Sequence, residues 1–246
     1  MMSRPVLLIA GGSRGIGAAT ARLAGARGYD VAVNYVSNAD AAASVAAAVK
    51  KSGGNALALQ GDMGREEDIA RVFNATVDGL GAITHFVHSA GIIGPMSRLD
   101  EVSTQTLREV LEVDTLGAML CVRECVRRMS TKHGGKGGAI VLLSSMAATI
   151  GGANECVWYA AAKGAIDSLT IGVSREVAKE GIRVNAISPG MIDTDIQPPG
   201  RLERLMPMLP MGRAGSADEV AEAVLYLLSD AASYINGANL RVSGAR

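Results

Sequence analysis

The chain has 246 residues, of which 48% are hydrophobic, and its 24 Lys and Arg are balanced by 24 Asp and Glu. This length and composition suit a single α/β domain over residues 1–246 with a large apolar core. Because the formal net charge is zero and only 3% of the residues are aromatic, we expect no nucleic-acid or membrane partner. No apolar run reaches the roughly 18 residues of a membrane span.

The three cysteines are odd in number and lack the spacing of metal ligands. Cys121 and Cys125 are four residues apart in an apolar helical stretch, which is typical of small core side chains. The apolar run near the N-terminus is too short for a signal peptide. We therefore expect a cytoplasmic protein with reduced cysteines and no bound metal.

Strand patterns and helix patterns alternate along the chain. The predicted strands cover 5–10, 30–35, 55–60, 83–89, 138–144, 182–187 and 238–242. The predicted helices cover 15–28, 38–52, 65–79, 99–130, 157–180 and 216–229, and Ser216 opens the last with a capping box. Most strands are continuously apolar, as expected when both faces are covered. Right-handed crossovers then predict an α/β fold, a seven-stranded doubly wound parallel sheet with helices on both faces.

A glycine-rich turn joins the first predicted strand to the first predicted helix. Gly11, Gly15 and Gly17 have the spacing G-x-x-x-G-x-G. A turn of this kind places a dinucleotide pyrophosphate at the N-terminus of the helix, where backbone N–H groups bind anions. The alternative is a plain strand–helix turn, because glycine is common in such turns.

Tyr159 and Lys163 are four residues apart and share one face of the predicted helix 157–180. A phenol is a poor acid–base catalyst at neutral pH unless a nearby ammonium stabilises its phenolate. Ser145 follows an apolar strand, at the edge where open α/β sheets bind ligands. A Tyr and a Lys at this spacing are by themselves usually a surface pair. The glycine turn and Ser145 on the same sheet edge favour a catalytic role.

The segment 191–213 is the one long stretch without a regular pattern. Its Met, Leu and Pro residues make it too apolar for a solvated linker. We expect a mobile lid over a substrate pocket, and the alternative is a packed surface loop.

The chain as a whole resembles the short-chain dehydrogenase/reductase family, in the branch of the ketoacyl-carrier-protein reductases and glucose dehydrogenases. Residues 10–17 resemble the family's T-G-x-x-x-G-x-G loop, residues 88–91 its N-N-A-G motif, and residues 189–194 its P-G-x-x-x-T segment. The resemblance implies a single-domain Rossmann fold and a homotetramer. It also implies the interconversion of a ketone and a secondary alcohol with NADP(H) or NAD(H).

The resemblance also assigns residue roles. The catalytic set is Ser145, Tyr159 and Lys163, with Asp114 at the position of a catalytic Asn. The cofactor-binding positions are Gly11, Ser13, Arg14, Gly15, Ile16, Gly17, Asn34, Tyr35, Ser37, Asp62, Met63, Ser89, Ala90, Gly91, Tyr159, Lys163, Pro189, Gly190, Ile192 and Thr194. Asp62 would contact the adenine, and the Ile192 backbone with the Thr194 hydroxyl would hold the carboxamide.

Four positions depart from the family's pattern. Ala10 replaces the usual Thr, and His88 and Ser89 replace two Asn residues, so we expect altered hydrogen bonding rather than lost cofactor binding. Asp114 replaces an Asn that orders a water relay to the catalytic Lys. An ionised Asp accepts hydrogen bonds but cannot donate them, and its charge would favour charged Lys163 while opposing a phenolate.

The second predicted strand indicates which cofactor is preferred. Members of the family that use NAD carry an acid at its end to bind the ribose hydroxyls, and residues 31–37 contain none. Arg14 could pair with a 2′-phosphate, and Asn34 and Ser37 could donate hydrogen bonds to it. Val36 stands where NADP-using relatives often carry a second Arg. The missing acid favours NADP(H), with NAD(H) as the alternative.

Other polar residues suggest structural roles. His85 and His88 are three apart on a strand and should face opposite sides, which argues against a metal site. Trp158 is either a core anchor or a pocket wall. Charged residues along 99–130, including Glu124, most simply form a solvated or interface surface.

The helices predicted over 99–130 and 157–180 also bear on possible protein partners. Arg127, Arg128 and Arg175 could receive an acidic acyl-carrier protein, although a solvated patch is the simpler explanation. Apolar residues on more than one face of 99–130 and 157–180 predict a homo-oligomer. The altered motif positions leave a non-catalytic dinucleotide-binding sensor or scaffold as the alternative to an enzyme acting on a small carbonyl or alcohol. The intact Ser-Tyr-Lys set favours the enzyme.

Overall fold

The structure, a computed structural model, describes residues 4–245. These residues form a seven-stranded sheet in which all neighbouring strands are parallel, in the order β3-β2-β1-β4-β5-β6-β7. The strands are β1 (Val6–Ala10), β2 (Asp30–Tyr35), β3 (Ala56–Gln60), β4 (Ile83–His88), β5 (Gly138–Leu143), β6 (Ile182–Pro189) and β7 (Asn239–Val242). The predicted doubly wound parallel sheet is confirmed, and each strand end lies within two residues of its expected position.

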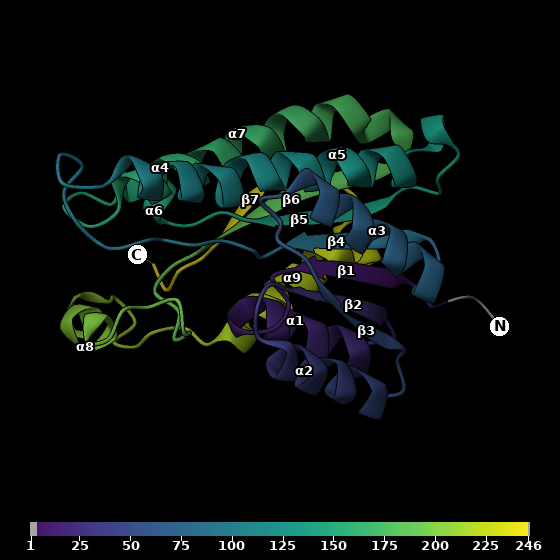
Figure 1. The fold of residues 1–246 in the computed structure, drawn as a ribbon, viewed down its shortest axis with the longest axis horizontal. Helices are drawn as coiled ribbons and strands as arrows, with labels where there is room; N and C mark the ends of the chain where they lie inside the picture. The colour runs from purple at the N-terminus through teal and green to yellow at the C-terminus, as the bar shows by residue number, and fades with distance from the viewer. Residues whose placement is uncertain (1–3, 246) are drawn as a thin grey trace.

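Helices cover both faces of this sheet, as Figure 1 shows. The helices on one face are α1 (Gly15–Ala26), α2 (Ala39–Lys51) and α9 (Ala217–Leu228), and those on the other are α3 (Glu66–Leu80), α5 (Gly117–Met129) and α7 (Val157–Val177). In β1, Leu7 and Ile9 are buried in the first of these layers and Leu8 in the second. Both faces of the strand are covered, which explains its continuously apolar sequence.

The predicted helix 99–130 differs from the observed structure. It consists of α4 (Thr104–Leu111), one π-helical turn over Glu112–Leu116, and α5. A π turn contains one extra residue, which changes the direction of the side chains within it. Asp114 is buried in this turn. At Gly117 a Cβ would lie 2.1 Å from the Met63 carbonyl oxygen, so only glycine allows the chain to pass so closely.

The segment 191–213, expected to be irregular, contains the short helix α8 (Arg201–Leu205) and a 3-10 turn over Met206–Met208. Figure 1 shows α8 apart from the three layers of the fold. Met191, Leu205 and Leu209 are buried together as a small apolar cluster of their own. The apolar composition of the segment therefore serves packing within it.

Two local predictions, on the cysteines and on Ser216, are confirmed. All three cysteines are buried and free. Ser216 caps α9 in a reciprocal capping box with Glu219. Within residues 4–245, none of the helices is long and apolar enough to cross a membrane.

Candidate active site

A cavity opens at the carboxyl ends of the strands, and residues far apart in the sequence line it. Many of the predicted site residues meet there: Ile16, Ser89, Gly91, Ser145, Tyr159, Lys163, Pro189, Gly190, Ile192 and Thr194. They come from the start of α1, the loops after β4 and β5, the end of β6 with the loop after it, and α7. This is the edge at which ligands bind in open α/β sheets.

Lys163 lines this cavity, one helical turn after Tyr159. Its Nζ lies 5.5 Å from the centre of the Tyr159 ring and donates a hydrogen bond of 3.0 Å to the Leu143 carbonyl. Burial would lower the pKa of Lys163, but Asp114 and Tyr159 outweigh it and raise the pKa, so the amine is charged. A fully charged ammonium therefore faces the phenol ring.

The Tyr159 phenol experiences opposing influences. Burial raises its pKa, Lys163 lowers it, and Asp114 raises it. A hydrogen bond with Ser145 also lowers the pKa of this phenol. The net shift is upward, so Tyr159 carries its proton at neutral pH.

Asp114 reaches this group of residues from the π turn. Its Oδ1 accepts a 2.8 Å hydrogen bond from the Ile92 N–H, and its Oδ2 lies 3.2 Å from Lys163 Nζ. Burial raises the pKa of Asp114 and outweighs the opposing effects of Lys163 and the Ile92 N–H. The sequence position thus places a carboxyl group in direct contact with the Lys of the predicted catalytic set.

The two serines after β5 have different contacts. The Ser145 Oγ accepts a 3.1 Å hydrogen bond from the Ala147 N–H and lines the cavity. Ser144 is buried, and its Oγ donates to the Lys163 carbonyl at 3.1 Å. Ser144 therefore ties α7 to β5, a contact that the adjacent Ser-Ser pair did not reveal in the sequence.

The glycine-rich turn packs closely against its surroundings. Gly11 has a φ of +72°, and a Cβ there would lie 2.7 Å from the Ala90 backbone. At Gly17 a Cβ would lie 2.2 Å from the Gly11 carbonyl oxygen. Helix α1 begins at Gly15 with no side chain capping it and no acid in its first turn. Its positive end thus remains available, and these residues fit the pyrophosphate of a dinucleotide.

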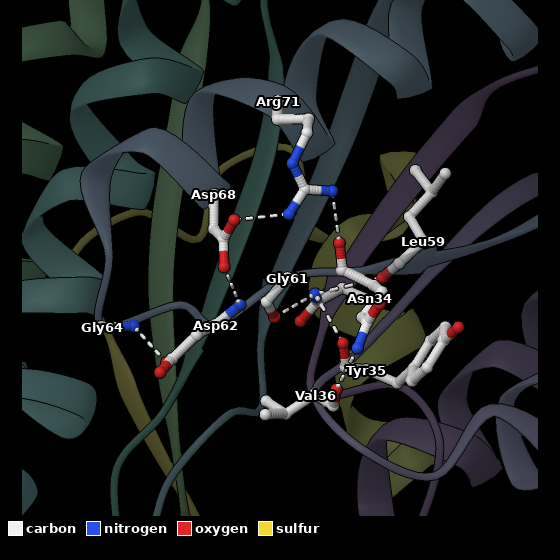
Figure 2. A network of polar contacts seen from close by, with 10 residues as sticks. Asn34, Tyr35, Val36, Leu59, Gly61, Asp62, Gly64, Asp68 and Arg71 are labelled. Atoms are coloured by element: carbon white, nitrogen blue, oxygen red, sulfur yellow. Dashed lines mark hydrogen bonds and ion pairs between the residues drawn. The ribbon is translucent and has the colours of Figure 1, made fainter.

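Asn34, expected to donate to a 2′-phosphate, has another position. Its side chain is buried, its Oδ1 accepts from the Gly11 N–H at 3.1 Å, and its Nδ2 donates to the Gly61 carbonyl at 2.8 Å and to the Leu59 carbonyl at 3.3 Å. Figure 2 shows the amide directed into this network of backbone groups. The expected phosphate contact is therefore wrong, because both amide hydrogens have acceptors within the protein.

The remaining cofactor positions surround the same edge. Arg14 and Ser37 are exposed, Ser13 and Tyr35 are half-buried, and none of these four side chains has a hydrogen bond among the described contacts. Asp62 is half-buried and accepts from the Gly64 N–H at 2.9 Å. Met63 is buried in the core with its sulfur 3.8 Å from Cys121, so only its backbone can contact a ligand.

Trp158, expected to be either a core anchor or a pocket wall, is held in the protein by a hydrogen bond. The side chain is buried, and its Nε1 donates to the Ile93 carbonyl at 2.7 Å. It does not line the cavity. Trp158 is therefore a core anchor, which sets the position of the start of α7.

The two histidines of β4 face opposite sides, as predicted. His85 packs edge-on against Tyr29, and His88 lies beside Phe86. Burial lowers the pKa of His85 to about 4 and that of His88 to about 3. Among residues 4–245, no group of three or more His, Cys, Asp or Glu side chains could hold a metal ion.

Glu124 is not part of a solvated surface, contrary to expectation. It is buried, and both Arg127 and Arg128 pair with it. Burial alone would raise its pKa, but hydrogen bonds from Arg128 and Arg127 outweigh this and lower the pKa. The negative charge of Glu124 thus partly neutralises the positive charge of Arg127 and Arg128.

Comparisons with known proteins agree with this geometry. The family model described as enoyl-(acyl carrier protein) reductase matches residues 10–244. An uncharacterized oxidoreductase of Escherichia coli K12, YgfF, is 43% identical, with 98% of this chain and 99% of that protein covered. Cis-4-hydroxycyclohexanecarboxylate dehydrogenase of Sinomonas cyclohexanicum is 37% identical, with 97% and 95% covered.

A solved structure supports the same assignment. The short-chain dehydrogenase/reductase of Serratia marcescens has a TM-score of 0.91 and 30% identity, with 99% of this chain and 98% of that chain covered. The chain therefore belongs to the short-chain dehydrogenase/reductase family and is an NAD(P)-dependent oxidoreductase.

Proposed function

We propose that this enzyme interconverts a ketone and a secondary alcohol through Ser145, Tyr159 and Lys163, with NADP(H) as the preferred cofactor. One observation carries the proposal: these three side chains line the same cavity as Ile16 and Gly190 of the dinucleotide-binding loops. An acid–base group and a cofactor site thus share one space.

The residues divide the chemistry between them. When bound, the nicotinamide supplies or accepts the hydride. In the reductive direction Tyr159 gives its proton to the substrate oxygen as the C–H bond forms, and in the oxidative direction it takes that proton back. Ser145 polarises the carbonyl by donating a hydrogen bond to its oxygen. Lys163, charged and held by the Leu143 carbonyl, stabilises the phenolate left after proton transfer.

Asp114 stands where the family has an Asn, which can donate a hydrogen bond. We assign it as a positioning residue that holds Lys163 Nζ through its carboxylate, with the Ile92 N–H holding the carboxyl group in turn. Its negative charge opposes the phenolate, so it raises the pH at which Tyr159 accepts a proton from an alcohol.

The preference for NADP(H) rests on charge at the end of β2. Residues 31–37 contain no acid, and exposed Arg14 lies at the start of α1. With Asn34 engaged elsewhere, Arg14 and Ser37 are the side chains that we propose for the 2′-phosphate. The remaining positions of the loops would bind the cofactor as the family resemblance implies.

The alternative function is a dinucleotide-binding sensor without turnover. The carboxyl group at Asp114 and the imidazole at His88 favour it, because both depart from the family's pattern. Consumption of NADPH and NADH with a panel of cyclic ketones, diketones, β-ketoacyl thioesters, sugars and steroids tests the two functions. Tight cofactor binding with no turnover on any member of the panel would support the sensor.

We also propose a lid, an assembly and a location. The segment 191–213 contributes Met191, Ile196 and Arg201 to the cavity and would close over the substrate. For the assembly, we propose a homotetramer built on α5 and α7, in or next to which Leu116, Met119 and Ile171 expose apolar side chains. For the location, we propose the cytoplasm. Sedimentation as a monomer at micromolar concentration would refute this assembly.

A further inference from the structure

The proposed active-site cavity also contains an arginine from the segment 191–213. Arg201, the first residue of α8, lines this cavity together with Glu155 and Gln197. Its side chain is only 13% exposed, although a guanidinium stays charged at all physiological pH values. A charge shielded from water in this way requires compensation by partners of opposite charge.

Glu155 compensates Arg201 only in part. One of its carboxylate oxygens lies 2.7 Å from Arg201, and the other lies 2.6 Å from Arg204. Burial alone would raise the pKa of Glu155, but hydrogen bonds from Arg204 and Arg201 outweigh it and lower the pKa. Two cations thus share a single anion, and the group keeps an excess positive charge beside the cavity.

The guanidinium of Arg201 also has donors to spare. One of its amino groups donates to the Gln197 Oε1 at 2.8 Å and the other to Glu155, while its Nε is buried with no hydrogen-bond partner. A guanidinium carries five N–H donors, and leaving buried donors unmet costs free energy. A ligand that supplies further acceptors would therefore bind favourably here.

The other substrate-side walls of the cavity are largely apolar. They include Met146, Ile150, Met191 and Ile196. An apolar cavity with a few polar groups selects a ligand with an apolar body and polar groups at matching places. Tyr159 and Arg201 are two such groups, one suited to a carbonyl oxygen and the other to a planar carboxylate.

We propose that Arg201 binds a carboxylate, so that the substrate is an apolar keto acid or hydroxy acid. The inference rests on the proposed oxidoreductase function, because Tyr159 must act on the same molecule. The substrate carboxylate takes the unused donors of Arg201, while Arg204 retains Glu155.

The first test compares reduction of 4-oxocyclohexanecarboxylate with that of its methyl ester, with NADPH or NADH. A charge-assisted pair predicts a kcat/KM about tenfold or more in favour of the acid. Arg201→Gln should abolish this preference by raising the KM for the acid, and Arg201→Lys should restore it in part. Arg204→Gln is the matched control, because Arg204 also pairs with Glu155 but is 61% exposed and lies outside the cavity lining.

A second measurement needs no turnover. Calorimetric titration of the NADP⁺ complex with cyclohexanecarboxylate and with cyclohexanecarboxamide should show binding of the acid in preference to the amide, and Arg201→Gln should remove that preference. Equal binding of acid and amide, or binding of neither, would overturn the inference. The inference would also be overturned if Arg201→Gln and Arg204→Gln lost the same amount of the preference for the acid. A higher KM for NADPH in Arg201→Gln, with acid and ester alike, would overturn it as well.

The two measurements also separate the two proposals. Selective carboxylate binding without turnover of any carbonyl compound would refute the proposed ketone–alcohol interconversion and leave an anion site. Turnover of the ester and the acid at equal kcat/KM would keep the oxidoreductase function and refute the role of Arg201. Circular dichroism and thermal unfolding establish that each variant is folded.

Discussion

Asp114 Oδ2 lies 3.2 Å from Lys163 Nζ, and both side chains are almost completely shielded from solvent. Replacing Asp114 with Asn removes the negative charge that raises the pKa of the Tyr159 phenol. The apparent pKa that governs alcohol oxidation should therefore fall, while reduction persists or improves because Asn restores a hydrogen-bond donor. The pH–rate profiles of the two proteins measure this shift.

Stability provides the control for this variant. Removing one partner of a buried ion pair leaves the other uncompensated, which costs on the order of 3–5 kcal/mol. The free energy of unfolding should therefore fall as well. A loss of stability with an unchanged pH–rate profile would limit Asp114 to bracing the Ile92 backbone.

Tyr159→Phe should remove the exchangeable proton and keep the aromatic ring in place. General acid–base groups contribute about 10²–10⁴-fold to rate, so kcat should fall by that order. NADPH affinity, measured by fluorescence titration, should stay close to that of the wild type. Near-normal kcat in this variant would contradict the acid–base role.

Arg14→Ala should weaken NADPH binding and leave NADH binding nearly unchanged, because only NADPH carries the 2′-phosphate. For an exposed, charge-assisted contact we expect a loss of about tenfold. Arg22→Ala is the matched control, since Arg22 is also exposed on α1 but lies two turns further along. Equal losses for both cofactors would refute the phosphate contact.

The two histidines of β4 predict sensitivity to acid. Burial lowers the pKa of His85 to about 4 and of His88 to about 3, whereas both lie near 6.5 in the unfolded chain. Below pH 6.5 the unfolded chain therefore binds protons that the folded protein does not, so stability falls as the pH decreases from 6.5 towards these values. At pH 5 the loss is about 2 kcal/mol for each histidine.

Urea unfolding at pH 7.5 and pH 5.0 measures this difference. His88→Asn should reduce it by roughly half, since one of the two imidazoles with a lowered pKa is gone. His133→Gln, at an exposed position, should leave it as in the wild type. An equal pH dependence in all three proteins would show that buried imidazole does not determine acid stability.

The sheet could be predicted from the sequence because buried parallel strands leave a local signal, the continuous apolar run. The π turn could not, because a helix over 99–130 satisfies the same apolar pattern. The extra residue depends on contacts distant in sequence, namely Asp114 with Lys163 and Gly117 with the Met63 backbone. The sequence of residues 112–116 itself contains no pattern that indicates those contacts.

The site shows the same division. The pairing of Tyr159 with Lys163 could be predicted from the sequence, because residues four apart share one helical face. The hydrogen bonds of the Asn34 side chain could not be predicted. Its amide contacts backbone groups of Gly11 and Gly61, which only the folded sheet brings near. Glu155 and Arg201 are 46 residues apart, and their pairing follows from the path of the segment 191–213.

The strand order has a consequence for synthesis on the ribosome. β1, β2 and β3 lie next to one another in both sequence and space, so these three strands can pair once residues 1–60, about a quarter of the chain, have emerged. The other edge of β1 must wait for β4, and the cavity needs β5 and β6 as well. Until then β1 exposes an unpaired apolar edge, which is a common route to aggregation during folding. We expect translation pauses between β1 and β4 to lower the yield of soluble enzyme.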